Sequence, residues 1–297
     1  MKSWLSTLAR AFGAAPLWLL HGLGGFVGTV LWLVPNKPRR LTQWHVGHCL
    51  PELDAGERRR LVRLSLQHMF KAVLEAPAFW FGGRRRLERW LADADAVRQL
   101  RALRDEGRGV IWLCPHLGAW ELSGLFCSAG GPMTSLYKPQ KDAVFDRIMH
   151  DGRTRLGAHL VPTDGGGVKA LLTALKRKEM IGILPDHDPP PGSGVFAPLF
   201  GMSAHTTELV SKLAARSGAP VWFCVAERLP WGRGYRFHLS PAPDDVADPV
   251  GGATALNRGV EAVVRRMPEQ YWWAYERYRH QPDGEPNPYR VPRRQRR

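Results

Sequence analysis

Three histidines in this chain are followed five positions later by an acidic residue, and their surroundings differ. His280 lies in a Pro-rich tail, and His159 precedes a strand-like run that would carry it away from its acid. His116 follows the short apolar run 109–114, which predicts a buried strand, and precedes a helix-like segment that contains Glu121. Catalytic groups of open α/β sheets gather where strands end and helices begin. His116 is therefore the candidate catalytic histidine.

A histidine and a carboxylate at that edge can act together as a general base. A carboxylate bonded to one ring nitrogen fixes the tautomer and raises the basicity of the other nitrogen, which can then remove a hydroxyl proton. The spacing predicts that Glu121 orients His116 in this way. A capping glutamate beside an incidental histidine would give the same spacing, so the assignment needs support from other segments.

Two acids in a second segment could support the site. Asp186 and Asp188 directly follow the apolar run 180–184, and three prolines come after them. The Asp-His-Asp sequence could hold a metal, but the prolines fix an extended loop and no Cys/His cluster with ligand spacing is adjacent, so we expect none. The apolar segment 194–201 beside it favours the mouth of a hydrophobic channel, with Val195, Phe196 and Phe200 as candidate lining residues.

A third candidate is a cation just past a strand-like run. Lys138 follows the run 134–137, and the next predicted helix carries Arg147, Arg153 and Arg155. A lysine in that position could stabilise an oxyanion or bind a phosphate. An ordinary surface lysine would have the same sequence context.

The elements that must position these residues alternate along the chain. Strands are predicted at 109–114, 134–137, 159–161, 180–184, 219–225 and 235–239. Helices are predicted at 55–80, 118–128, 142–156, 166–178, 206–216 and 254–267. This alternation is typical of an α/β domain with a largely parallel, mixed sheet flanked by helices.

The N-terminus adds a separate element. No charged residue occurs from Ala11 to Pro35, and basic residues flank the stretch on both sides. Its length favours a retained, membrane-associated helix, although an in-plane amphipathic hairpin or a buried core helix would also fit. We therefore divide the chain into an anchor at 1–40, a catalytic domain at 41–280, and a Pro/Arg-rich tail at 281–297 that is expected to fray.

Composition narrows the possible partners. The chain has 297 residues, 44% of them hydrophobic, so it is globular rather than disordered. Its net charge of +15 predicts an affinity for polyanions, and its 12 tryptophans favour a membrane interface. No helix-turn-helix, zinc-finger or RNP pattern occurs, so nucleic acid is not expected as a partner. None of the four cysteines forms a C-x-x-C pair, which predicts buried, reduced thiols.

Taken together, the motifs resemble a known family. The block His116-Leu-Gly-Ala-Trp-Glu121 and its preceding strand are similar to the first block of the glycerolipid acyltransferase superfamily. The order and spacing of the later motifs resemble the lipid A biosynthesis (lauroyl/myristoyl) acyltransferases of Gram-negative bacteria. The matching segments are Tyr137-Lys138-Pro139, Arg155-Leu156-Gly157-Ala158, Asp164-Gly165-Gly166-Gly167, Asp186-His187-Asp188, 194–201, Thr206-Thr207 and 268–273.

Two departures from the family pattern stand out. Pro115 precedes His116 where asparagine or a small residue is usual. Residues 275–279 read Tyr-Glu-Arg-Tyr-Arg where the family usually has His-Arg-Arg-Phe-Lys. The second departure concerns the specificity for the acceptor rather than the type of reaction.

The resemblance implies transfer of a fatty acyl chain from acyl carrier protein to a hydroxyl of a lipid A precursor, a phosphorylated glycolipid. It implies a catalytic domain on the cytoplasmic side of the bacterial inner membrane, and no cofactor. His116 would be the base and Glu121 would orient it. The expected substrate-binding residues are Lys138, Arg153, Arg155, Asp186, Asp188, Val195, Phe196, Phe200 and Thr206. An alternative is another membrane acceptor, such as a glycolipid, phosphatidylinositol mannoside or lysophospholipid.

Overall fold

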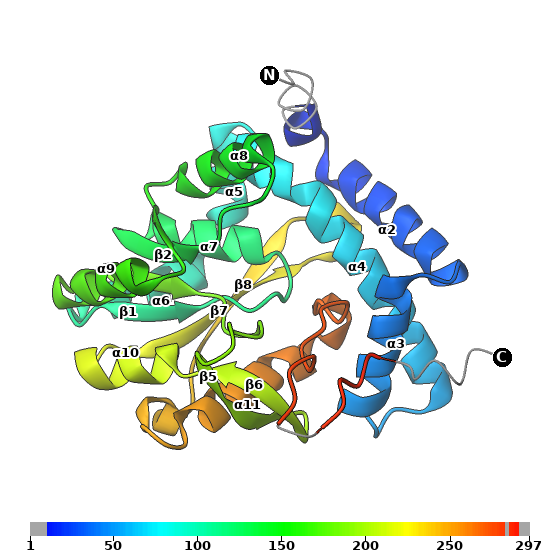
Figure 1. Ribbon diagram of the computed structural model, residues 1–297. Coiled ribbons are helices and arrows are strands. Elements are labelled where there is room, and N and C mark those ends of the chain that lie inside the picture. The colour runs from blue at the N-terminus through cyan, green and yellow to red at the C-terminus, as the bar shows by residue number, and fades with distance from the viewer. Residues whose placement is uncertain (1–10, 283–284, 291–297) are drawn as a thin grey trace.

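A six-stranded sheet forms the centre of the molecule (Figure 1). The structure is a computed structural model that describes residues 11–282 and 285–290. The strand order is β3-β2-β4-β1-β7-β8; all neighbours are parallel except β7 and β8, which are antiparallel. The strands are β1 (Val110–Leu113), β2 (Met133–Tyr137), β3 (His159–Pro162), β4 (Met180–Ile183), β7 (Val221–Arg228) and β8 (Tyr235–Pro241).

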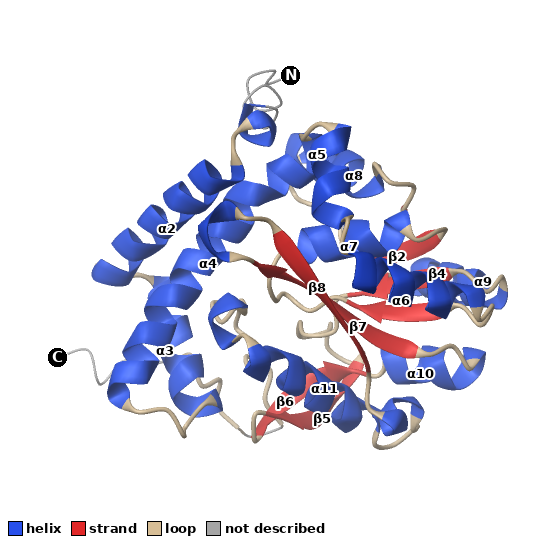
Figure 2. Cartoon of the chain, turned by 180° about the vertical axis from the view of Figure 1, so that it is seen from behind, coloured by secondary structure: helices blue, strands red, loops and turns tan. Residues whose placement is uncertain are grey.

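The two central strands are apolar on both faces because helices cover both sides of the sheet. Every residue of β1 and of β4 is buried. Figure 2 shows the strands lying between two sets of helices. The helices on one face are α6 (Ala94–Asp105), α7 (Trp120–Ala129) and α8 (Ala143–Thr154). Those on the other face are α9 (Gly165–Lys176), α10 (Leu209–Ser217) and α11 (Gly252–Arg266). The predicted α/β class with a mostly parallel sheet is therefore confirmed.

The N-terminal part forms a helical layer beside the sheet. It consists of α2 (Leu17–Leu33), α3 (Lys37–Cys49), α4 (Ala55–Phe81) and α5 (Arg84–Leu91). α2 runs alongside α4 in both views (Figures 1 and 2). Their backbones come close because Gly24 and Gly28 have no side chain: a Cβ at Gly28 would lie 2.4 Å from the Cα of Gln67. Within the described residues no single helix has the length and apolarity to cross a bilayer, whereas α2 and α3, bent by 82°, meet those limits as a pair.

A buried polar network ties α2 to the sheet. The ring of His21 shares a 2.8 Å hydrogen bond with the Glu75 carboxylate on α4, and Arg228 Nε at the end of β7 donates to the same carboxylate at 2.6 Å. Burial alone would raise the pKa of Glu75, but the Arg228 guanidinium and the His21 bond hold it below its usual range. All three side chains are buried, so the network replaces their lost hydration.

One prediction about local structure is wrong. The segment 194–201, expected to be a loop, forms a two-stranded antiparallel sheet of β5 (Gly194–Leu199) and β6 (Met202–Thr207). In the turn between them, Phe200 has φ 49° and Gly201 has φ 75°. Positive φ at both central residues is typical of a type I′ turn, which matches the right-handed twist of the two strands. Thr206, expected at the start of a helix, therefore lies on β6, and α10 begins at Leu209.

The other predicted strands and helices are present with small shifts at their ends, whereas α3, α5 and α6 were not predicted. The described residues also form three short 3-10 helices, η1 (Pro230–Gly232), η2 (Asp244–Ala247) and η3 (Pro268–Gln270). All four cysteines are buried and unpaired, as expected. Part of the tail does not fray: Tyr289 is buried and its hydroxyl bonds to the His45 ring at 2.7 Å. Residues 283–284 and 291–297 of that tail lie outside the described residues.

Candidate active site

His116 lies in a short loop between β1 and α7. The loop is held at both sides, since Leu117 forms a β-bridge with Tyr271 and Gly118 lies directly against β7. A Cβ at Gly118 would lie 2.2 Å from the carbonyl oxygen of Ala226, and its φ of +62° favours glycine. The Gly118 carbonyl in turn accepts a 2.6 Å bond from Arg228 Nη2. Glycine is needed two positions after His116 so that the loop can lie this close to the sheet.

Asp186 holds His116 at two points. Its Oδ1 lies 3.0 Å from the ring Nδ1, and its Oδ2 accepts the His116 backbone N–H at 2.9 Å. Burial would raise the pKa of Asp186, but the charge and hydrogen bonds of His116 keep it below its usual range. An ionised Asp186 requires a proton on Nδ1, which leaves Nε2 as the basic nitrogen. The His116 side chain is 14% exposed, so part of it remains open to solvent.

The prediction that Glu121 orients the His116 ring is wrong, because Asp186 takes that position. Glu121, at the start of α7, instead forms a two-point ion pair with Arg153 of α8, with Nε donating to Oε2 at 2.9 Å. Trp80 Nε1 also donates to this carboxylate at 3.2 Å. Burial would raise the pKa of Glu121, but Arg153 lowers it below the usual value. Arg153, predicted as a substrate-binding residue, thus lies beside the His116 block through its pair with Glu121.

An aromatic stack covers one face of the His116 ring. The His187 ring lies parallel to it, with ring centres 3.7 Å apart, and Tyr275 stacks on the other face of His187 at 4.0 Å. Although the His187 side chain is partly exposed to solvent, its packing between two rings and the nearby charge of His116 hold the pKa of His187 below its usual value. A neutral His187 can lie against His116 without charge repulsion. The stack fixes the plane of the His116 ring, while Asp186 fixes its rotation.

A small, mostly apolar pocket opens beside Glu121 and Arg153. The charged side chains in its lining are those of the Glu121–Arg153 pair, and the rest of the wall is mostly apolar. The lining residues come from the ends of β1 and β4 and from β2, β3, α7 and α8: Cys114, Trp120, Gly124, Leu125, Ser128, Met133, Ser135, Leu136, Ala158, Leu160, Gly182, Ile183 and Leu184. A pocket of this kind can hold a hydrocarbon chain whose reactive end lies near the charged pair.

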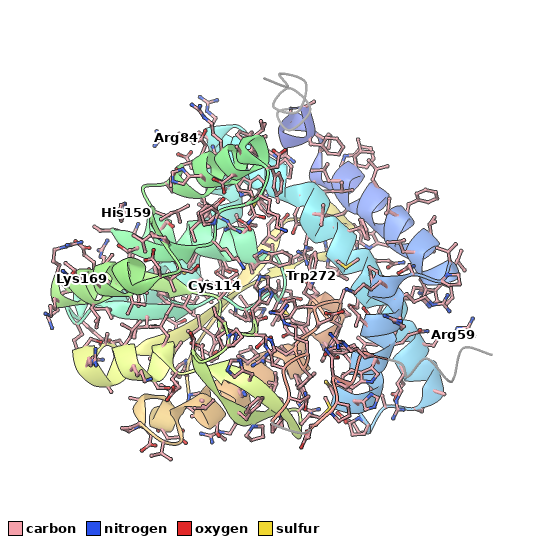
Figure 3. The ribbon with its side chains drawn as sticks, in the orientation of Figure 1. Arg59, Arg84, Cys114, His159, Lys169 and Trp272 are labelled. Atoms are coloured by element: carbon pink, nitrogen blue, oxygen red, sulfur yellow. The ribbon has the colours of Figure 1, made fainter. Side chains whose placement is uncertain are left out.

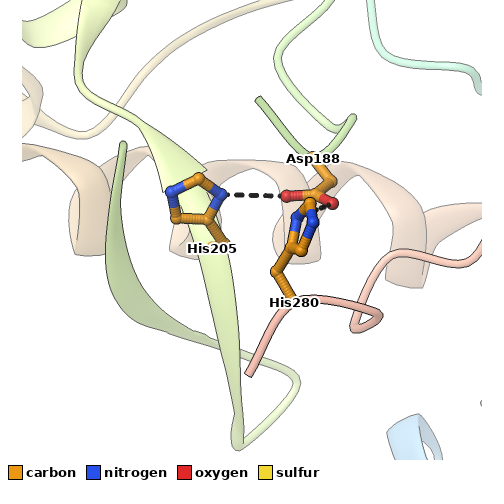
Figure 4. Close-up of side chains that lie close together, drawn as sticks. All are labelled: Asp188, His205 and His280. Carbon is orange, nitrogen blue, oxygen red and sulfur yellow. Dashed lines mark hydrogen bonds and ion pairs between the residues drawn. The ribbon is translucent and has the colours of Figure 1, made fainter. Parts of the chain in front are cut away.

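Asp188 lies in a second polar cluster. Figure 4 shows the His205 and His280 rings turned toward its carboxylate, at 2.9 Å and 2.7 Å. Their ligand atoms lie within 4.8 Å of one another, which would suit a metal ion by distance. However, Arg279 Nε donates to the same carboxylate at 2.9 Å, and Arg277 donates to the His205 carbonyl at 2.6 Å. A guanidinium bonded to the carboxylate and a second one at the neighbouring His205 carbonyl disfavour a divalent cation, so we assign the cluster a structural role.

Several predicted binding residues lie away from the pocket. Lys138 is exposed in the loop after β2 and does not line the pocket. The Arg155 guanidinium donates to the carbonyls of Phe79 and Gly82, and so joins the end of α8 to α4.

The predicted apolar channel at 194–201 is not the pocket beside Glu121. Phe200 is buried against Trp273, and Thr206 is buried and accepts a 2.9 Å bond from Arg277. Val195 and Phe196 are exposed on β5. The hairpin thus supports the Asp188 cluster, and the pocket is formed by the sheet and its helices.

An O-acyltransferase needs a base that removes a hydroxyl proton close to an apolar pocket, and the histidine and the pocket described above meet that need. The profile of the family described as "Bacterial lipid A biosynthesis acyltransferase" matches residues 4–280. The chain belongs to this family, as the resemblance of its motifs predicted.

Curated relatives are similar over nearly the whole chain. A lipid A biosynthesis lauroyltransferase of Escherichia coli K12 is 28% identical over 97% of this chain and 95% of the relative. A palmitoleoyltransferase of lipid A biosynthesis from the same organism is 25% identical over 94% and 93% of the two chains. A myristoyltransferase of lipid A biosynthesis from that organism is 25% identical over 92% of this chain and 83% of the relative.

Proposed function

We propose that this acyltransferase moves a fatty acyl chain from acyl carrier protein to a hydroxyl group of a lipid A precursor, on the cytoplasmic side of the bacterial inner membrane. The observation that carries the proposal is the His116–Asp186 pair, with Nδ1 held at 3.0 Å and the His116 ring centre 5.3 Å from that of Trp120, which lines the apolar pocket. The names of the relatives support the lipid A acceptor.

The reaction needs no covalent acyl-enzyme. His116 Nε2 takes the proton of the acceptor hydroxyl while its oxygen attacks the thioester carbonyl carbon. The carbon–sulfur bond then breaks, and the departing thiolate takes the proton back from His116, so the carrier leaves as a free thiol. Asp186 stabilises the imidazolium that forms between these two transfers.

Arg153 supports the charge that develops on the thioester oxygen. It lines the pocket, and its bonds to Glu121 use Nε and Nη2. A guanidinium in a poorly hydrated pocket stabilises an oxyanion more strongly than it would in water. Glu121 holds this guanidinium in place, so its role is to position Arg153 rather than the base.

The net charge of +15 supports both proposed substrates. Acyl carrier protein is acidic, and a phosphorylated glycolipid is anionic. Electrostatic attraction raises the rate at which such partners meet a basic protein. The same argument applies to other anionic membrane acceptors, so the choice of acceptor requires a direct assay.

The test compares His116→Ala with a matched control, His159→Ala, in isolated membranes. His159 is exposed on β3 at the far edge of the sheet (Figure 3). We expect His116→Ala to lose acyl transfer by at least a hundredfold and His159→Ala to keep it. Acyl carrier protein and coenzyme A thioesters are supplied in parallel, with a lipid A precursor or a lysophospholipid as the acceptor. Near-normal transfer by His116→Ala, or exclusive use of the lysophospholipid, would overturn the proposal.

A further inference from the structure

One side of α2 presents large apolar side chains to the solvent. Trp18, Phe26 and Leu33 are 63%, 68% and 63% exposed, and they follow one another along the helix. Contiguous apolar side chains that stay exposed on a folded protein are typical of binding surfaces. The same side of the helix also carries Leu19, Leu23, Val30 and Val34.

The opposite side of α2 belongs to the protein core. Gly24 and Gly28 lie against the backbone of α4, where any side chain would collide. His21 joins the buried network with Glu75 and Arg228. The helix is therefore fixed lengthwise on the catalytic domain, and only its outer side can meet a partner.

A second segment extends this apolar surface. Trp231, in the turn between β7 and β8, is 89% exposed. The turn lies against the start of α2, since a Cβ at Gly232 would be 2.5 Å from the backbone nitrogen of Trp18. Tryptophan is favoured where hydrocarbon and water meet. Trp231 and Trp18 thus belong to one surface built from two parts of the chain.

Basic residues lie at both ends of this surface. Near the C-terminal end of α2, the guanidinium groups of Arg59 and Arg63 lie over the Trp32 ring at 5.3 Å and 5.9 Å. Near the N-terminal end, Arg86 donates to the carbonyls of Gly13 and Ala15. Figure 3 shows Arg84 and Arg59 toward the two ends of α2, and Lys169 on the opposite edge of the molecule. An apolar stripe with cationic ends is typical of helices that bind anionic lipid surfaces.

We propose that α2 and the Trp231 turn form a docking face that lies in the plane of an anionic lipid bilayer rather than across it. α2 has 17 residues, which at about 1.5 Å per residue gives a length of about 26 Å, less than the roughly 30 Å of a bilayer core. Its inner side remains bonded to the domain, so its outer side enters the region between headgroups and acyl chains. The inference rests on the proposed function only in taking a membrane as the partner.

The first experiment measures binding of the purified full chain to vesicles by flotation. Vesicles of phosphatidylethanolamine and phosphatidylglycerol are compared with phosphatidylcholine alone. Phe26→Ser/Trp231→Ser should bind the anionic vesicles at least tenfold more weakly than the wild type. Val250→Ser is the matched control, because Val250 is equally exposed but precedes α11, away from the docking face. Unchanged binding by the double variant would overturn the proposal.

The basic ends are tested in the same assay. Arg59→Gln/Arg63→Gln should weaken binding to the anionic vesicles and reduce its salt dependence. Lys169→Gln/Lys176→Gln, on α9, removes the same charge from the opposite edge and should bind as the wild type does. If both double variants lost vesicle binding equally, net charge rather than the docking face would drive binding, and the proposed role of the basic ends would be overturned.

A second experiment separates a helix in the plane from one across the bilayer. Cysteines are placed at Ala14 and Pro35, two exposed positions at the ends of α2, against a background of four buried native cysteines. A membrane-impermeant maleimide is added to spheroplasts and to inverted vesicles. We expect both positions to react only in inverted vesicles; reaction from opposite sides would overturn the in-plane orientation.

Acyl transfer to a detergent-dispersed acceptor is measured on the same proteins. The docking variants should retain it, because their substitutions lie outside the pocket. Vesicle binding without any transfer by the wild type would refute the proposed function and leave the docking face intact.

Discussion

Replacing Asp186 by asparagine tests the assignment of the base most directly. The Asn oxygen can keep the 2.9 Å bond from the His116 backbone N–H, so the loop should remain in place. The amide nitrogen then faces the ring Nδ1, which in the wild type lies 3.0 Å from a carboxylate oxygen. An amide donor there requires Nδ1 to accept, which moves the ring proton to Nε2. The substituted protein would hold the wrong tautomer for removing a proton.

Asp186→Asn removes two contributions to the rate: the tautomer of His116 that can act as a base, and the carboxylate charge that stabilises the imidazolium. General-base catalysis contributes about 10²- to 10⁴-fold to a rate. The same Asp-to-Asn change beside the catalytic histidine of a serine protease lowers kcat by about 10⁴, again through the tautomer. We therefore expect Asp186→Asn to lower kcat by about 10³-fold, equivalent to about 4 kcal/mol of transition-state stabilisation. KM should change little, because Asp186 is buried behind the ring.

The assay is steady-state acyl transfer by purified protein in detergent, with circular dichroism and thermal unfolding to monitor the fold. Asp164→Asn serves as the control, since Asp164 caps α9 through the backbone N–H of Gly167, and asparagine is an equally good cap. Its activity should stay within about threefold of the wild type. A loss of less than tenfold in correctly folded Asp186→Asn would refute the assignment of His116 as a base oriented by Asp186.

Three further predictions concern residues around the base and in the wall of the pocket. Glu121→Gln should destabilise the protein by about 1.5–3 kcal/mol at pH 7, because it weakens the two-point ion pair with Arg153, whose side chain is 26% exposed. Since the pKa of Glu121 is lowered on folding, this stabilisation is complete above its unfolded value of about 4.3 and is lost as the pH falls through the folded pKa, so urea unfolding of the wild type and the variant should converge in acid. Gly182→Val should shift the preferred donor to a shorter acyl chain in a competition assay. A Cβ at this position would lie 2.3 Å from the end of the Met133 side chain in the pocket wall. An unchanged chain-length profile would argue that the acyl chain binds elsewhere. His187→Phe should keep activity within about threefold, whereas His187→Ala should lose about tenfold and show a broader pH–rate profile, because aromatic stacking contributes roughly 0.5–1.5 kcal/mol. Equal activity of the two variants would contradict a positioning role for the stack.

The sheet and the position of the base could be predicted because both depend on local pattern. β1 and β4 are short apolar runs bounded by turn residues, which is typical of strands buried on both faces. His116 could be located because it follows one of these runs directly. Neither prediction depends on the order of the strands in the sheet.

The partner of the base could not be predicted because it depends on strand order. In the sheet, Leu113 of β1 pairs with Ile183 of β4. His116 and Asp186 each lie three positions beyond this pair, so the parallel neighbours carry them to the same place. The sequence contains both strands but does not show that they are adjacent, so sequence spacing alone favours the nearest acid, Glu121, over Asp186.

The β5–β6 hairpin was missed for a different reason. Pro198 lies within β5, and proline is usually absent from strands except at sheet edges, where β5 lies. The turn also lacks the common Asn-Gly or Asp-Gly pair, and it places Phe200 at a positive φ that is unusual for an aromatic residue. Its apolar residues therefore resembled a channel lining rather than a strand pair.

The network around Arg228 has a consequence for any shortened form of the enzyme. Arg228 bonds the Gly118 carbonyl in the loop of His116 and also the Glu75 carboxylate, whose other oxygen bonds to His21 on α2. A chain that begins at α3 would lose His21 and open this network to a cavity, although α2 contributes nothing to the pocket itself. Such losses cost several kcal/mol, a large share of the stability of an ordinary domain. Deleting the apolar helix to ease purification would thus loosen the catalytic loop, and solubilising substitutions on the outer side of α2 are the better route to a well-behaved enzyme.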